Sequence, residues 1–197
     1  MRGTIEQLAG AAVVGDMSAG TGFTPGFASR LDLANGRSVF VKAASSADDE
    51  LHGWPLSDAY REEVRKLTAL PGGIGAPSLL WHRDVELDGL RWIVVGFQYV
   101  DATPPRRPWR REQLALVLDK LSATAAVLTA VPPELGLEPV AQHLVERYPQ
   151  RLAQARQAHG ASEWLDTVEE LCAEGVDRTA GESIVHLDLR DDNILIG

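Results

Sequence analysis

The sequence predicts an α+β fold in which a small antiparallel sheet occupies the first half of the chain and helices occupy most of the second half. Two strand patterns with an Asn-Gly or Asp-Gly pair at their centres, at residues 31–42 and 85–95, are typical of β-hairpins. Apolar residues at helical spacing dominate residues 114–173. The run Thr103-Pro104-Pro105 lies between the two halves and indicates a hinge, so we expect two lobes.

Composition and charge exclude several classes of protein. The chain has 197 residues, of which 45% are hydrophobic and 24% charged, which is typical of a globular protein. Its net charge of -9 argues against a general surface for nucleic acid or for an anionic membrane. The sequence shows neither a signal peptide nor a transmembrane run, so we expect a cytoplasmic protein.

The single cysteine excludes an internal disulfide framework. Cys172 belongs to a helical stripe with Trp164, Leu165, Val168 and Leu171, and we expect this stripe to lie in the core.

A glycine-rich segment, Gly20–Phe27, precedes the first strand pattern at residues 28–33. Glycine has no Cβ, so the N–H groups of such a loop can approach an anion closely, and Gly22 and Gly26 become candidate phosphate-binding positions. The alternative is a flexible turn, because the segment matches neither the P-loop nor the dinucleotide fingerprint.

The first hairpin places a lysine near the end of its second strand. Alternation along Val39–Lys42 puts Phe40 and Lys42 on one face, so we expect the ammonium group beside an apolar ring. The alternative is a lysine that merely solubilises an edge strand.

A helix predicted at residues 56–70 carries two adjacent carboxylates near its first turns. Glu63 stands four and seven residues before Leu67 and Leu70, so it lies along the buried stripe, whereas Glu62 is rotated away. We therefore favour Glu63 as the partner of Lys42. The alternative is an ordinary acidic first turn that is stabilised by the helix dipole.

The triplet His82-Arg83-Asp84 precedes the second hairpin and matches part of a kinase motif. We set it aside, because the position five residues after Asp84 is Gly89.

Near its C-terminal end the sequence has two apolar runs, at residues 184–187 and 194–196, which we interpret as short buried strands around a polar loop. The spacing of His186, Asp188 and Asn193 is that of the kinase catalytic loop, in which the Asp accepts the proton of the substrate hydroxyl and the Asn holds magnesium. The alternative is a solvated acidic turn with His186 in the core.

With its glycine loop, Val39–Lys42, Arg61-Glu62-Glu63 and residues 186–193, the chain resembles the aminoglycoside phosphotransferase and choline kinase-like family. This family is a branch of the protein-kinase-like fold. The resemblance implies a bilobal protein-kinase-like fold, with an N-lobe at residues 1–101, formed by the sheet and one helix, and a mainly helical C-lobe at residues 102–197.

The resemblance also implies magnesium-dependent transfer of the ATP γ-phosphoryl group to a small-molecule hydroxyl, as in aminoglycosides, amino alcohols or sugars. Asp188 would deprotonate that hydroxyl, Asn193 would coordinate Mg2+, and Lys42, held by Glu63, would bind phosphates. Backbone groups at Gln98, Tyr99 and Val100, before the hinge, would pair with the adenine edge.

The chain departs from the family pattern in two ways. Leu187 stands where many members have Gly, and Arg190 where many have His, but neither replaces the acid or the metal ligand. The family places a further metal-binding Asp and substrate-binding helices beyond the position at which this sequence stops, Gly197. We therefore expect an incomplete site and C-lobe, as in a truncated or fragmentary kinase, with self-association through the incomplete lobe.

Two other functions stay open from the sequence. The first is a noncatalytic nucleotide-binding or interaction module, and the second is a structural domain whose carboxylates are only solvated. Asp191 and Asp192 would suit a cationic acceptor or would simply cap a turn.

Overall fold

The computed structural model describes residues 1–19, 26–52, 55–129 and 135–197. The chain divides into two compact units, one formed by Met1–Val127 with Val185–Gly197 and the other by Leu128–Ile184. Helix α4 (Arg111–Val127) and the last thirteen residues belong to the same compact unit as the sheet. The division into an N-lobe at residues 1–101 and a C-lobe at residues 102–197 stays a prediction.

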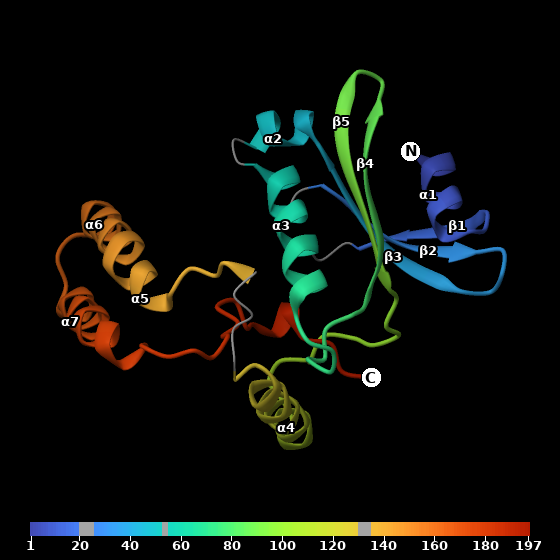
Figure 1. Cartoon of the computed structure of the whole chain (residues 1–197). Coiled ribbons are helices and arrows are strands. Elements are labelled where there is room, and N and C mark those ends of the chain that lie inside the picture. Colours follow the sequence, from blue (N-terminus) through green and yellow to red (C-terminus); the bar gives the residue numbers. More distant parts are fainter. Residues whose placement is uncertain (20–25, 53–54, 130–134) are drawn as a thin grey trace. The chain divides into compact units, whose positions relative to one another are not determined.

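The first unit is built on a five-stranded antiparallel sheet with the strand order β1-β2-β3-β5-β4 (Figure 1). Its strands are β1 (Val13–Ser18), β2 (Phe27–Leu33), β3 (Ser38–Ser45), β4 (Leu79–Leu87) and β5 (Leu90–Gln98). Both predicted hairpins are confirmed. Their turns use positive φ angles, with φ 81° at Gly36 and with φ 54° and 75° at Asp88 and Gly89, as the Asn-Gly and Asp-Gly pairs require.

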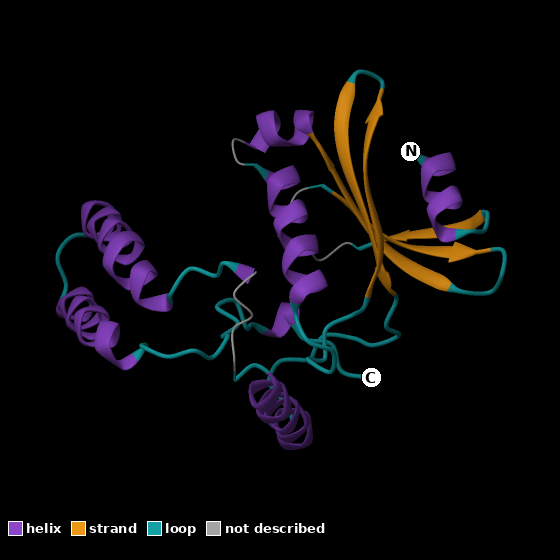
Figure 2. Cartoon of the chain, viewed as in Figure 1, coloured by secondary structure: helices purple, strands orange, loops and turns teal. Residues whose placement is uncertain are grey.

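The central strands β3 and β5 bury side chains on both faces of the sheet, so there are two cores. On one face Val39 and Val41 pack with Ile5 of helix α1 (Arg2–Ala9). On the other face Phe97 packs with Tyr60 and Val64 of helix α3 (Leu56–Ala69). Figure 2 shows these two helices on opposite sides of the strands.

The sequence did not predict helix α1, strand β1 or helix α2 (Ser46–His52) of this unit. A capping box begins α2. The Ser45 backbone N–H donates to the Asp48 carboxylate at 2.6 Å, and the Asp48 N–H donates to the Ser45 hydroxyl at 3.3 Å. The Ser-x-x-Asp pattern was therefore a signal for this helix in the sequence.

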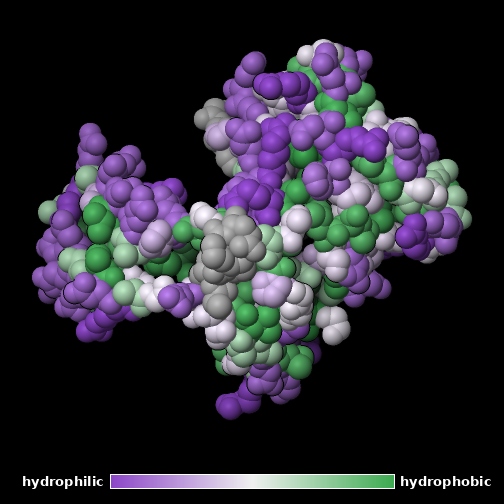
Figure 3. Space-filling view, in the orientation of Figure 1, coloured by the Kyte–Doolittle hydropathy of each residue, from purple (hydrophilic) through white to green (hydrophobic). Residues whose placement is uncertain are grey.

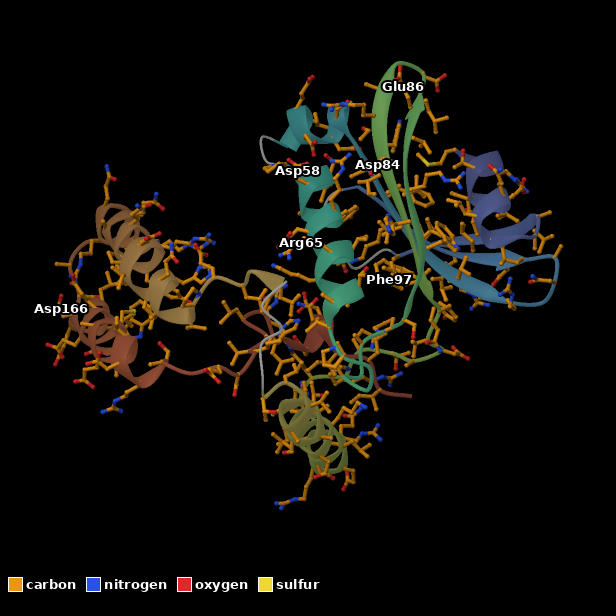
Figure 4. The ribbon with its side chains drawn as sticks, in the orientation of Figure 1. Asp58, Arg65, Asp84, Glu86, Phe97 and Asp166 are labelled. Carbon is orange, nitrogen blue, oxygen red and sulfur yellow. The ribbon has the colours of Figure 1, made fainter. Side chains whose placement is uncertain are left out.

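Helix α3 is fixed by contacts near its N-terminal end. Asp49 of α2 accepts hydrogen bonds from the Ser57 N–H at 2.7 Å and from its hydroxyl at 2.6 Å, and so caps the helix from outside. Arg61 donates to Asp84 of β4 at 2.7 and 2.9 Å, and to Asp58 at 2.9 Å. Figure 4 shows Asp58 and Asp84 on these neighbouring elements.

The predicted strands near the C-terminal end do not form as expected. Residues 184–187 have no strand structure, and Val185 and Leu187 are exposed. In residues 194–196 an isolated antiparallel bridge joins Ile196 to Thr103, with N···O distances of 3.1 and 2.8 Å. Apolar side chains alone do not make a strand, because its backbone needs a paired neighbour.

Helix α4 leaves most of its apolar residues at the surface, where Figure 3 shows hydrophobic side chains. Leu114, Leu116 and Leu118 are exposed, and Val117 is the buried residue of the helix.

The second unit contains three helical segments after residue 139. These are α5 (Val140–Gln142), which continues through a π-helical stretch, His143–Arg147, into α6 (Tyr148–His159), and α7 (Glu163–Arg178). Ser162 caps α7 by accepting a hydrogen bond from the Leu165 N–H at 3.3 Å.

The predicted core stripe of α7 is only partly correct. Leu165 is buried, but Trp164 and Leu171 are exposed, and Cys172 and Val168 are half-buried. No helix in the described ranges is long and apolar enough to cross a membrane.

Gly26 provides a test of how closely the chain approaches α3. A Cβ at this position would lie 3.0 Å from Leu56 Cδ2 and 3.2 Å from the Ala43 carbonyl oxygen, and φ is +117°. We expect Gly26→Ala to lower the free energy of unfolding by about 2 kcal/mol, from backbone strain and overpacking together. Gly36→Ala is the matched control, because φ is also positive at Gly36, +81°, but a Cβ built there would have no described neighbour within 4 Å. Urea denaturation measures the free energy of unfolding of both variants. An equal decrease in the two would contradict the close approach of Gly26 to Leu56 and Ala43.

Candidate functional site

Lys42 and Glu63 form a two-pronged ion pair between β3 and α3. The Lys42 Nζ lies 2.8 Å from Glu63 Oε1 and 3.0 Å from Oε2. The ammonium group also lies 5.2 Å from the centroid of the Phe97 ring and 5.6 Å from that of Tyr60. Figure 4 labels Phe97 on β5 beside α3. The predicted apolar neighbour of the lysine is therefore present, but it comes from β5 and α3.

Glu62 points to different partners. It accepts hydrogen bonds from Arg65 at 2.6 and 2.7 Å and lies 3.3 Å from the Lys66 ammonium group. These contacts, that with Arg65 first, lower the pKa of Glu62 to about 2. Of the two carboxylates that the sequence left open, the one that faces Lys42 is therefore Glu63.

Tyr60 lies beneath this ion pair. Burial of the phenol, together with the negative charges of Glu63 and Asp48, raises the pKa of Tyr60 to about 12. The ring is a neutral wall of the site at physiological pH.

The segment predicted to pair with adenine begins at the end of β5. The Gln98 N–H donates to the Ser78 carbonyl at 2.8 Å, and the Val100 carbonyl accepts from the Ala102 N–H at 3.0 Å. These two groups are thus already used within the protein. The Tyr99 ring lies under the Arg30 guanidinium, whose carbon is 4.6 Å from the ring centroid.

Arg30 was not among the predicted site residues. It pairs in register with Phe40, so it lies on the face of the sheet that carries Lys42. Asp32 holds it through a hydrogen bond of 2.8 Å, and Ser38 donates to the same carboxylate at 2.6 Å. Strand alternation across the first hairpin was the signal that could have found it.

Asp188 and Asn193 are joined directly. The Asn193 amide nitrogen donates to the Asp188 carboxylate at 3.0 Å and to its carbonyl at 2.9 Å. Arg190 lies 3.2 Å from the other oxygen of that carboxylate. His186 accepts from the Asp188 N–H at 3.3 Å, and it is exposed, so it is not the buried core histidine of the alternative interpretation.

The two remaining acids of the loop each bind an arginine. Arg190 donates to both oxygens of Asp192 at 3.0 Å. Arg107 donates to both oxygens of Asp191 and is the main cause of a lowered pKa at that carboxyl.

A complete magnesium site is not assembled from the described residues. They contain no group of three or more His, Cys, Asp or Glu side chains that could hold a metal ion. Asn193 offers one neutral oxygen, and each of the three nearby aspartates is bound to an arginine. Within the described ranges no hydrogen bond or ion pair joins Lys42 or Glu63 to Asp188 or Asn193.

The two glycine candidates have different outcomes. Gly22 lies outside the described residues. Gly26 packs against Leu56 and Ala43, so its lack of a side chain has a structural reason that is independent of any phosphate.

A groove of about 490 Å3 lies between α3 and the hairpin of β4 and β5, and none of the predicted site residues lines it. Its charged lining includes Arg61, which donates hydrogen bonds to both Asp58 and Asp84.

Searches against protein-family models and curated proteins found no match. Among solved structures the chain is similar to one described as a "putative fructosamine-3-kinase" from Thermobifida fusca YX-ER1, with 20% sequence identity and a TM-score of 0.52. The similarity covers 90% of this chain but 61% of the other chain, so this sequence spans about three-fifths of that protein. This likeness shows that the fold is kinase-like, with a small sheet lobe and helices, as the sequence predicted.

The raised pKa of Tyr60 has a consequence at alkaline pH. An unfolded tyrosine ionises near pH 10, whereas Tyr60 stays protonated to about pH 12, so the unfolded state releases this proton first. The free energy of unfolding should fall as the pH rises above 10, by about 1 kcal/mol at pH 11.

Urea denaturation at pH 9 and pH 11 measures this loss. The Tyr60→Phe variant should lack this part of the decrease in the free energy of unfolding between pH 9 and pH 11, whatever its free energy of unfolding at pH 9. The same loss in wild type and Tyr60→Phe would contradict the assignment.

Proposed function

We propose that the chain is a small-molecule kinase that transfers the γ-phosphoryl group of ATP to a hydroxyl group. The observation that carries the proposal is the ion pair of Lys42 with Glu63, on a strand and a helix of a kinase-like fold. A strand lysine held by a helix carboxylate keeps a compact cation in one place, where it can bind the α- and β-phosphates.

Asp188 is the proposed base. The acceptor oxygen would attack the γ-phosphorus, the bond from that phosphorus to the β–γ bridging oxygen would break, and Asp188 would take the hydroxyl proton. The contacts of Asp188 support this role, because they hold its side chain in one orientation. The Asn193 amide binds one carboxylate oxygen, and Arg190 lies next to the other.

Mg2+ would supply charge neutralisation between the phosphates. The described residues do not form its complete site, so we assign no step to the metal. This observation also favours a second candidate, a noncatalytic nucleotide-binding module.

The acceptor class is proposed by analogy. The similar structure is described as a fructosamine kinase, and fructosamine is a sugar amine. Sugar amines of this kind are therefore the first acceptors to screen, followed by aminoglycosides and amino alcohols. We propose no nucleic-acid or membrane partner, in keeping with the net charge of -9.

Nucleotide binding should depend on Glu63 and not on its neighbour. ATP with Mg2+ at a hundredfold excess over its dissociation constant should stabilise the wild-type chain by roughly 2.7 kcal/mol, which is a readable shift in thermal unfolding. Lys42→Ala and Glu63→Gln should lose most of this shift, because each removes one half of the pair.

Glu62→Gln is the matched control. It removes a carboxylate of the same helix that binds Arg65 and Lys66, so its shift should equal that of wild type. A lost shift in Glu62→Gln as well, or no shift in wild type, would count against the proposed nucleotide site.

Turnover separates the kinase from the noncatalytic module. With ATP, Mg2+ and the acceptor panel, the wild-type chain should form ADP and phosphorylated acceptor, and Asp188→Asn should lower kcat by at least a hundredfold with the ATP-induced shift retained. A wild-type chain that binds ATP but phosphorylates no acceptor would support the module.

A further inference from the structure

We propose that Arg107 is a positioning residue that holds the loop of Asp188 and Asn193 in place through Asp191. The catalytic part of this inference rests on the proposed function. The structural part does not.

The contact between Arg107 and Asp191 has the geometry of a two-pronged clamp. The guanidinium donates through Nε to one carboxylate oxygen and through a terminal nitrogen to the other, the latter at 2.6 Å. The two residues are 84 positions apart in the chain. The Asp191 side chain is only 16% exposed, whereas that of Arg107 is 77% exposed, so the arginine reaches in from the surface to a shielded carboxylate.

Asp191 is the first residue of the turn that presents Asn193. This turn is a single 3-10 turn, Asp191–Asn193, in which the Asn193 N–H donates to the Arg190 carbonyl at 3.0 Å. Asn193 in turn donates to the Asp188 carboxylate at 3.0 Å. A clamp on Asp191 therefore restricts the start of the turn whose end contacts the proposed base.

The segment that supplies Arg107 holds the loop at a second point. Thr103, four residues earlier, forms the antiparallel bridge to Ile196, with N···O distances of 3.1 and 2.8 Å. The stretch 191–196 is thus fixed at both ends by residues 103–107. Two residues separate this stretch from Gln98–Val100, so the segment predicted to pair with adenine and the loop of the proposed base are connected through one short stretch of chain.

The clamp requires an arginine. A planar guanidinium can donate to both oxygens of a carboxylate at once, whereas an ammonium group meets it as a single point charge. Arg107→Lys keeps the positive charge but should lose the two-pronged geometry. Exchange of the two residues, with Asp at position 107 and Arg at position 191, should restore part of that geometry.

Amide hydrogen exchange on the full chain tests the structural part without any assay of activity. In Arg107→Gln the amides of Asn193 and Ile194 should exchange about tenfold faster, whereas the Ile196 amide keeps its bridge to Thr103. Arg107→Lys should lie between wild type and Arg107→Gln. The double variant Arg107→Asp with Asp191→Arg should recover slower exchange than either single variant.

Arg106→Gln is the matched control, because Arg106 is an adjacent exposed arginine that makes no hydrogen bond or ion pair with the described residues. Unchanged exchange at Asn193 and Ile194 in Arg107→Gln, or equal acceleration in Arg106→Gln, would overturn the inference. A chain that unfolds globally would show faster exchange in β3 and β5 as well, and Arg107→Lys then provides the comparison.

Kinetics test the catalytic part. In a turning-over enzyme, Arg107→Gln should lower kcat at least tenfold and change the KM for ATP less than twofold, since the Lys42 and Glu63 pair is untouched. Faster exchange with an unchanged kcat would overturn the catalytic part. If the wild-type chain turns over no acceptor, the proposed function fails, and the exchange rates still decide whether Arg107 orders the turn.

Discussion

The attachment of α3 to the sheet is the constraint on which the candidate site depends. Lys42 belongs to a strand whose position is fixed by two neighbours in the sheet, whereas Glu63 belongs to a helix that could be placed in many ways. The apolar packing of α3 sets its distance from the sheet, but apolar contacts have little directional preference. The cap from Asp49 and the bridge from Arg61 to Asp84 supply direction, and they aim Glu63 at the lysine.

Local patterns in the sequence were sufficient for the hairpins and for the partner of Lys42. The Asn-Gly and Asp-Gly pairs specify positive φ angles, and the spacing of Glu63 from Leu67 places it on the buried side of its helix. Apolar runs near the C-terminal end were misleading, because strand formation depends on a partner that composition does not reveal. Ile196 found such a partner in Thr103.

The contact between Arg107 and Asp191 could not be predicted from the sequence. Arg107 and Asp191 are separated by 84 positions, and no periodicity links them, so the sequence indicated only an acidic turn at Asp191. The paired aspartates have a chemical consequence as well. Carboxylates that already bind arginines are poor candidates to recognise a cationic acceptor, which weakens that interpretation of Asp191 and Asp192.

The two polar attachments of α3 also determine how far each part of the helix moves when the helix tilts. Both lie in its first half, at Ser57 and Arg61, and a helix rises 1.5 Å per residue. Glu63 is therefore only about 3 Å along the axis from the Arg61 attachment, whereas Ala69 is about 12 Å from it. A tilt of about 10° about Arg61 would displace Ala69 by roughly 2 Å but Glu63 by only about 0.5 Å. A given tilt therefore changes the position of Glu63, and so the ion pair with Lys42, much less than the position of the far end of the helix.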